Sequence, residues 1–193
     1  MSSSPAASSA PLFPASLISA EATASLPPGF TIRPLARDDH ARGFYACLKV
    51  LTWVGGEDSG PDSDSEPSAD AFRARFDEMA AAAGTYYFLV IEHEGRVVGT
   101  GELVVERKFI HNHGKAGHVE EIAVAREHQG RGLGLALMRA LESVAVAVGC
   151  YKSILNCGPR NEPFYARCGF ENSGIEMSRY LEHPPAADAY HRG

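Results

Sequence analysis

The first ordered part of the chain combines one short strand pattern with two helical patterns. Residues 31–33 predict an opening strand. Apolar side chains then recur every three or four positions in two stretches, which predicts two helices. The first helix is expected to begin at a cap on Asp38 and to run to about Leu51. The second is expected to begin at a cap on Ser68 and to end at Gly84.

The hydrophobic pattern changes from helical spacing to β-rich runs near residue 86. Two such runs, 86–92 and 96–110, are joined by a Glu94-Gly95 turn that is typical of a hairpin. The remaining pattern predicts a strand at 117–124, followed by a helix from the glycine run to Gly149 and a strand at 151–157. A short helix from Asn161 and a closing strand at 170–180 complete the expected order. Three successive strands without crossover helices favour a mixed α/β sheet, partly antiparallel, over a doubly wound one.

Two segments lack the apolar content of a packed core. Residues 1–28 are rich in Ser, Ala and Pro and are expected to be disordered. Residues 55–68 combine turn-forming residues with acidic side chains and are expected to form a mobile surface loop. A single folded domain is therefore expected at residues 29–183, followed by a C-terminal tail at 184–193.

Composition and charge exclude several classes of protein. The chain has 193 residues, of which 45% are apolar, and its net charge of −6 is concentrated in the acidic loop. The near-neutral remainder disfavours nucleic-acid binding. The four cysteines form no CxxC pair, so no metal site is expected. No apolar run approaches the roughly 18 residues of a membrane span, and the N-terminus lacks the basic residues of a leader, so a cytoplasmic location is expected.

The strongest chemical signal is the run Gln129-Gly130-Arg131-Gly132-Leu133-Gly134 between a predicted strand and a predicted helix. Glycines allow close backbone approach, and the first helical turn offers unpaired N–H groups at the positive end of its dipole, so this turn can cradle a pyrophosphate. A Rossmann site needs an acid at the end of the next strand, which residues 154–157 lack, and Leu133 stands where a Walker site needs lysine. A turn that serves packing alone stays an alternative.

With the preceding Glu121-Ile122-Ala123-Val124, this run resembles motif A of the GNAT superfamily of acetyl-coenzyme A-dependent N-acetyltransferases. Further stretches resemble the glucosamine-6-phosphate N-acetyltransferases of fungal or animal type, including residues 106–111, 117–124, 150–152 and 161–170. The resemblance implies the GNAT fold and acetyl transfer from acetyl-CoA, without a metal, to the 2-amino group of glucosamine 6-phosphate. This step feeds UDP-N-acetylglucosamine synthesis. The resemblance also implies a homodimer with shared active sites.

Three sets of site residues follow from this resemblance. The residues expected to bind acetyl-CoA are Ile122, Ala123, Val124, Gln129, Gly130, Arg131, Gly132, Leu133, Gly134, Leu135, Asn161 and Tyr165. The residues expected to take part in catalysis are Glu120, Glu121, Asn156 and Tyr165. The residues expected to bind the sugar phosphate are Thr52, Lys108, Phe109, Ile110, His111, Glu120, Glu121, Tyr151, Lys152 and Arg179.

The expected chemistry needs a neutral amine and a protonated donor for the leaving thiolate. Glu120 and Glu121 are neighbours at the end of a strand and would normally face opposite sides of the sheet. A β-bulge there would expose both carboxylates, or free a backbone carbonyl and amide to orient the amine and the thioester oxygen. A solvated pair of charges on an edge strand stays an alternative. Tyr165 matches the family's tyrosine near the sulfur, whose hydroxyl can donate to the departing thiolate of coenzyme A. The family commonly has Asp at the position of Glu121 and Asp or Glu at that of Asn156. An asparagine can orient the amine but cannot accept its proton.

Other functions fit parts of this pattern. A GNAT enzyme that acts on protein lysines or small polyamines would favour an acidic groove, which residues 57–70 could supply. A sensor that binds acetyl-CoA or a sugar phosphate without turnover is a non-enzymatic alternative. Cys157 and Cys168 could form an acetyl-enzyme, but neither has a His base visible in the sequence, so we expect direct attack in a ternary complex.

Overall fold

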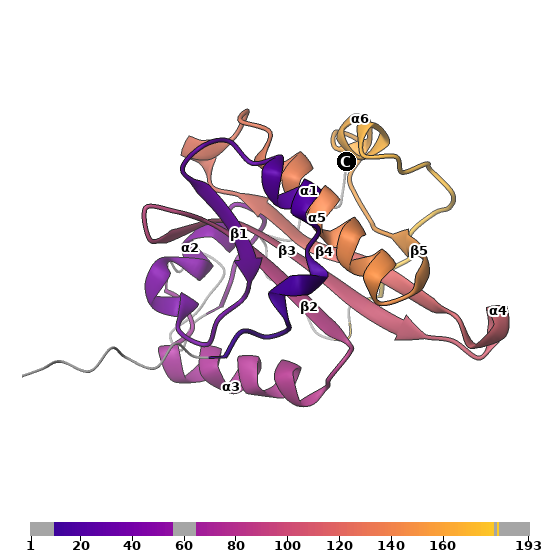
Figure 1. The fold of residues 1–193 in the computed structure, drawn as a ribbon, viewed down its shortest axis with the longest axis horizontal. Coiled ribbons are helices and arrows are strands. Elements are labelled where there is room, and N and C mark those ends of the chain that lie inside the picture. The colour runs from indigo at the N-terminus through magenta and orange to yellow at the C-terminus, as the bar shows by residue number, and fades with distance from the viewer. Residues whose placement is uncertain (1–9, 56–64, 180, 182–193) are drawn as a thin grey trace, which may run out of the picture.

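A computed structural model describes residues 10–55, 65–179 and 181, and it contains one five-stranded sheet in the order β1-β2-β3-β4-β5 (Figure 1). The strands are β1 Phe30–Pro34, β2 Tyr86–His93, β3 Arg96–Arg107, β4 Lys115–Val124 and β5 Cys150–Ile154. The first four strands pair antiparallel, and β4 pairs with β5 in parallel. The predicted mixed α/β sheet is therefore confirmed.

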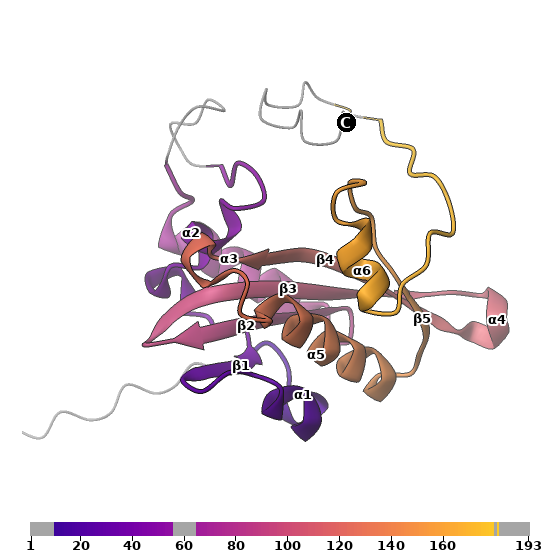
Figure 2. The same ribbon diagram turned by 90° about the horizontal axis from the view of Figure 1, so that it is seen from above.

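Helices cover both faces of this sheet. The α-helices are α1 Ala20–Ala24, α2 Phe44–Leu48, α3 Ala69–Ala81, α4 Ile110–His113, α5 Leu133–Ala147 and α6 Glu162–Arg167. Three 3-10 helices complete the set, η1 Ala15–Leu17, η2 Asp39–Arg42 and η3 Arg126–His128. Figure 2 shows α1 and α5 on one face of the sheet and α2 and α3 on the other.

Each face has its own hydrophobic core. Leu137, Leu141 and Val144 of α5 are fully buried and pack on the first face. Phe44 of α2 and Phe72 of α3 pack edge to face on the second, with ring centroids 5.1 Å apart. Successive residues of a strand serve opposite cores, as their alternation requires. The strands β3 and β4 lie between the two cores, and the candidate site lies on these strands.

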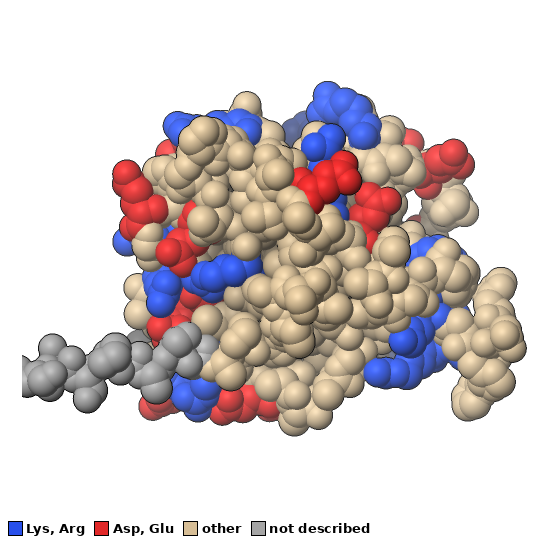
Figure 3. Space-filling model, viewed as in Figure 1, with Lys and Arg blue, Asp and Glu red and all other residues tan. Residues whose placement is uncertain are grey.

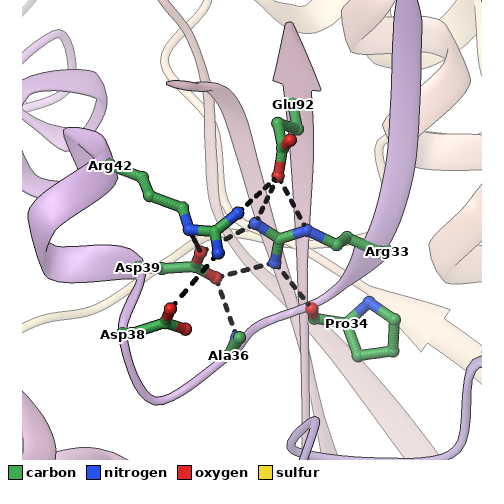
Figure 4. Close-up of polar contacts among 7 residues, drawn as sticks. All are labelled: Arg33, Pro34, Ala36, Asp38, Asp39, Arg42 and Glu92. Carbon is green, nitrogen blue, oxygen red and sulfur yellow. Dashed lines mark hydrogen bonds and ion pairs between the residues drawn. The ribbon is translucent and has the colours of Figure 1, made fainter. Parts of the chain in front are cut away.

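An ion cluster around the buried Asp39 fixes the start of η2 to the edge of the sheet (Figure 4). The fully buried Asp39 carboxylate accepts hydrogen bonds from Arg33 at 2.7 and 2.8 Å and from the Ala36 amide at 2.8 Å. Arg33 also bonds Glu92 of β2 at 2.7 Å, which lowers the pKa of the Glu92 carboxyl. Arg42 adds further contacts to both carboxylates. The cluster thus ties β1, β2 and η2 together.

The expectation of disorder at residues 1–28 is wrong for residues 10–28, while residues 1–9 lie outside the described part. Phe13, Ile18 and Ala22 are buried in the core on the α5 face. The Ser19 amide donates to Ser143 Oγ of α5 at 3.1 Å, and Ser19 itself caps α1. These few apolar residues suffice because α5 supplies the surface that covers them.

Several predicted boundaries also need correction. The helix expected from Asp38 to Leu51 is split by Gly43, whose left-handed φ of 88° separates η2 from α2. The strand expected to reach residue 110 ends at Arg107, because left-handed residues between 111 and 113 bend the chain into an arm at α4. The strand expected to run to residue 157 ends at Ile154. By contrast, Ser68 caps α3 as predicted.

The closing strand predicted at residues 170–180 is not formed by the described residues there. Residues 170–179 have no regular structure and run away from the sheet (Figure 2). Ile175 and Met177 are 94% and 93% exposed, so no part of the described chain covers their alternating pattern. A strand without a paired neighbour is not stable by itself, which explains the difference. The acidic loop prediction falls mainly on residues 56–64, which lie outside the described ranges.

Candidate active site

The outer edge of β4 is open over its second half. Pairing with β5 begins near Lys115 and ends at the pair His118 and Ile154, whereas β4 continues to Val124. The backbone of residues 119–124 therefore has no strand beside it on the β5 side within the described ranges. A ligand with amide groups can pair with such an edge like an added strand. This edge holds Ile122, Ala123 and Val124, three of the residues expected to bind the co-substrate.

The glycine-rich turn leads from this edge into α5. Gly130 and Gly132 have left-handed φ values of 76° and 82°, and a Cβ added at either would meet no atom within 4 Å. No side chain of the described residues caps the first turn of α5 at Gly132. The turn therefore presents backbone amides to open space, as an anion site requires. Arg131, Leu133 and Leu135 complete the predicted turn set.

Two further residues fix the turn in place. The Gln129 amide donates from Nε2 to the Val124 carbonyl oxygen at 3.0 Å and so joins the turn to the end of β4. A Cβ at Gly134 would lie 3.2 Å from Phe164 of α6, so the glycine allows α5 and α6 to pack closely. Both residues belong to the expected co-substrate set, and both have a structural role here.

A β-bulge at Glu121 interrupts the regular alternation of β4 next to Glu120. In the register, Glu120 lies opposite Glu102 and Ala123 lies opposite Thr100, so two residues of β4 face one residue of β3. Glu121 has a left-handed φ of 52°. The buried Thr100 hydroxyl donates to the Glu121 carbonyl oxygen at 2.9 Å and so holds the bulge. The bulge considered from the sequence at this position is present.

The carboxylates around this bulge repel one another in a partly dehydrated site. Burial raises the pKa of Glu120, and burial followed by the negative charge of Glu120 raises that of Glu121. The sequence did not point to a third member of this group, Glu102. Its pKa is raised to about 8, mainly by burial and then by the charges of Glu121 and Glu120. The available signal was one carboxylate inside the otherwise small and apolar run from Gly99 to Val105.

Tyr165 of α6 belongs to the same electrostatic group. Burial raises its pKa to about 12, with smaller effects from Cys157, Cys168 and Glu120. Its hydroxyl therefore keeps its proton at neutral pH and can act as a donor. The ring packs against Phe164, with centroids 5.0 Å apart.

Two asparagines lie near Tyr165 in the chain. Asn161 stands at the start of α6 with helical backbone angles of −95° and −12°, and its side chain makes no cap hydrogen bond. Its carbonyl oxygen accepts from the Phe164 and Tyr165 amides instead. Asn156 is exposed and lines, together with Tyr165, a hollow of about 1040 Å³. The hollow lies between α5, β5, α6 and the C-terminal segment, by which we mean the described residues that follow α6.

The residues expected to bind the sugar phosphate fall into separate groups. The rings of His111 and Tyr151 lie with their centroids 4.7 Å apart and their planes tilted by 36°, and Lys152 Nζ lies 5.9 Å from the Tyr151 ring centroid. Lys108, at the base of the α4 arm, pairs with Glu106 at 2.6 Å. Figure 3 shows the uncharged arm at the right edge, with Lys and Arg side chains gathered at its base. Ile110 shares α4 with His111, and Phe109 directly precedes that helix. Two expected members lie on other parts of the chain: Thr52 after α2 and Arg179 near the end of the described residues.

Neither a metal centre nor a membrane span is found in the described ranges. No three His, Cys, Asp or Glu side chains in residues 10–55, 65–179 and 181 are grouped as metal ligands. Over the same ranges, every helix is too short or too polar to cross a membrane.

The mixed sheet, the open β4 edge and the glycine turn before α5 define the GNAT class of acetyltransferases. The acetyltransferase (GNAT) family model matches residues 48–170. Glucosamine 6-phosphate N-acetyltransferase 1 of Dictyostelium discoideum is 36% identical over 81% of this chain and 94% of its own length, and the Candida albicans glucosamine 6-phosphate N-acetyltransferase is 39% identical over 79% and 96%. The crystal structure of the Arabidopsis thaliana enzyme of that name has a TM-score of 0.72 and 35% identity, over 79% of this chain and 99% of that chain. The chain belongs to the GNAT family and, within it, to the glucosamine 6-phosphate N-acetyltransferases.

Proposed function

We propose that this protein transfers the acetyl group of acetyl-CoA to the 2-amino group of D-glucosamine 6-phosphate, giving N-acetyl-D-glucosamine 6-phosphate and CoA. The observation that carries the proposal is the opened β4 edge, which has the bulge at Glu121 in its middle and the glycine turn at its end. This arrangement offers one site for an amide-bearing arm, one for a pyrophosphate and one for an amine. Family membership and the names of the relatives support the choice of substrates.

The chain offers a fitting cradle for acetyl-CoA. The amides of residues 130–135 would hold the pyrophosphate, since the glycines leave open space in front of them. The backbone edge of residues 122–124 would pair with the pantetheine arm. Acetyl-CoA supplies the activated thioester. Acetyl-CoA use is a property of the GNAT family to which the chain belongs.

The protein's own groups then orient the amine and stabilise the leaving thiolate. Glu120 and Glu121 face the substrate amine, and their raised pKa values suit a carboxylate that takes up a proton from an ammonium group. Tyr165 stays protonated and donates its hydroxyl hydrogen to the thiolate sulfur. Burial raises the pKa of the Cys157 and Cys168 thiols, which disfavours the thiolates that an acetyl-enzyme route needs. These features support direct attack in a ternary complex.

The sugar phosphate site and the oligomeric state are connected. The exposed large apolar residues gather on the α4 arm, on α5 and β5, and in the C-terminal segment: Phe109, Ile110, Val146, Tyr151, Ile175 and Met177. Because β5 is an edge strand next to a large hollow, this side of the molecule is suited to a second copy. We infer a homodimer in which Tyr151 and Lys152 of one protomer complete the phosphate site of the other. The four free cysteines fit a reducing compartment such as the cytoplasm.

A thiol-release assay tests the activity. The protein is supplied with acetyl-CoA and, in separate reactions, with glucosamine 6-phosphate, spermine or a basic peptide. We expect rapid CoA release only with glucosamine 6-phosphate, and a large loss of kcat in Tyr165→Phe with a small change in KM. Release with the peptide or spermine alone would overturn the substrate assignment, and tight acetyl-CoA binding without any release would indicate a sensor.

Mixed dimers test the shared site. Lys152→Ala and Tyr165→Phe are each expected to be poorly active alone. When the two variants are mixed under conditions of subunit exchange, one site of each heterodimer regains both wild-type residues if the sites are shared. Recovery of activity on mixing supports the proposal, and a mixture no more active than its components contradicts it.

A further inference from the structure

Glu102 is a buried carboxyl group for which the proposed mechanism has no role. It lies in the middle of β3, is 5% exposed and stands in register between Phe88 of β2 and Glu120 of β4. Directly opposite residues of antiparallel strands share a face and have Cβ atoms about 4.5–5.5 Å apart. Glu102 is therefore within side-chain reach of Glu120 on the substrate-facing side of the bulge.

One carboxyl oxygen of Glu102 has no hydrogen-bond partner among the described residues. This atom, Oε1, is buried. Thr100, two positions away on the same face of β3, gives its hydroxyl to the Glu121 carbonyl oxygen instead. An ionised carboxylate at this place would be a buried and unpaired charge, which is costly. A protonated carboxyl brings an O–H donor, and the carboxylates of Glu120 and Glu121 are acceptors.

The groups that face Glu102 favour its protonated form. Burial contributes most, the charges of the two neighbouring carboxylates add to it, and a guanidinium opposes it, with the result that the pKa is about 8. Phe88, its neighbour on β2, is apolar. The titratable and charged groups on the other packed elements are Tyr45 of α2, Arg75 of α3, and Glu120 and Glu121 of β4.

We propose that Glu102 is a positioning residue that works as a neutral carboxylic acid, donating its O–H hydrogen bond to the Glu120–Glu121 carboxylates and holding them toward the substrate amine. This inference rests on the proposed function. The proton stays on Glu102 during acetyl transfer, so no bond to this residue forms or breaks. Loss of that proton replaces the donor with a third negative charge and pushes the carboxylates apart.

Two substitutions separate this role from a purely structural one. Glu102→Gln keeps a neutral donor of similar shape and does not titrate, whereas Glu102→Leu keeps the volume and removes the donor. We expect Glu102→Gln to retain most of the wild-type kcat at neutral pH and to lose the decline in activity near pH 8. We expect Glu102→Leu to lose about 10–100-fold in kcat, the effect of small misplacements in an active site, with little change in KM. Equal losses in both variants, or a decline in Glu102→Gln identical to wild type, would overturn the proposal.

A spectroscopic titration gives a readout that needs no substrate. The carboxylic acid C=O infrared band is followed from about pH 6 to about pH 10 in the wild-type protein, with Glu102→Gln identifying the band and the exposed Glu21→Gln as matched control. A band assigned to Glu102 that disappears near pH 8 supports the proposal. A Glu102 that ionises near the ordinary value of 4.5 overturns it, even if the enzyme acetylates glucosamine 6-phosphate. A wild-type protein inactive on that sugar overturns the proposed function, and the infrared result then still decides the protonation state.

Discussion

The substitution Thr100→Val tests whether one hydroxyl group holds the bulge at Glu121. The Thr100 side chain is fully buried, and its hydroxyl donates to the Glu121 carbonyl oxygen at 2.9 Å. Valine has nearly the same shape, so the packing of β3 stays, and what is lost is the hydroxyl, with its bond to Glu121 and its contact with the Cys47 thiol. The hydrogen bond is partly buried, and the loss of its donor is expected to cost about 1–3 kcal/mol. The left-handed Glu121 would also lose a contact that stabilises its unfavourable backbone conformation.

These quantities give a measurable shift in thermal unfolding. For a domain of this size, each kcal/mol changes Tm by about 2–4 °C, so the loss is expected to lie at roughly 2–12 °C. The variants are compared at one protomer concentration, because the proposed dimerisation would make Tm depend on concentration. The matched control is Thr31→Val on β1, whose side chain is exposed. We also expect kcat/KM to fall in Thr100→Val and to stay unchanged in Thr31→Val. A Thr100→Val protein with wild-type Tm and wild-type kcat/KM would refute this account of the bulge.

Three further predictions concern groups outside the bulge. Glu102 should make the fold less stable as pH rises from about 4.5 to about 8, because the unfolded chain releases the Glu102 carboxyl proton at a lower pH than the folded protein does. The free energy of unfolding of Glu102→Gln should therefore rise relative to that of the wild type by on the order of a few kcal/mol across that range. Urea unfolding at several pH values measures this difference. Asp39→Ala leaves Arg33 without its buried carboxylate and should cost about 3–5 kcal/mol in urea unfolding, whereas the exposed Asp77→Ala should change little; equal effects would contradict the role given to the cluster in Figure 4. Phe13→Ala removes a buried ring that packs edge to face on Tyr87, with centroids 5.2 Å apart, and should cost about 3–5 kcal/mol; wild-type stability and wild-type resistance to proteolysis of residues 10–28 would show that this segment is not part of the core.

The sequence predicted best the elements that depend on local signals. The cap at Ser68 and the apolar spacing of Phe72 and Phe76 are enough to define α3, because a helix makes its hydrogen bonds within itself. The glycine run likewise indicated the start of α5, because glycines adopt the left-handed turn that precedes this leucine-rich helix. The hairpin at Glu94-Gly95 joins β2 and β3 for the same reason.

Features that depend on distant partners were missed or misjudged. Phe13 and Ile18 lie in a segment whose composition indicates disorder, and only α5, more than a hundred residues later, buries them. Ile175 and Met177 alternate like a strand, yet the described chain offers them no neighbour to pair with. Glu102 looks like a surface residue until β4 lies beside it. In each case the decisive contact is between residues far apart in the chain, which local pattern cannot reveal.

The two edges of β4 explain why strain and unusual charge gather there. The inner edge pairs with β3 and holds the sheet together, while the outer edge is open beyond His118, as the proposed co-substrate site requires. A regular strand would turn Glu120 and Glu121 to opposite faces, so the bulge is the feature that the proposed placement of both carboxylates at the substrate depends on. Thr100 stabilises that bulge from β3. If this reasoning holds, changes at Thr100 should lower stability and activity together, whereas changes at Phe13 should lower stability alone.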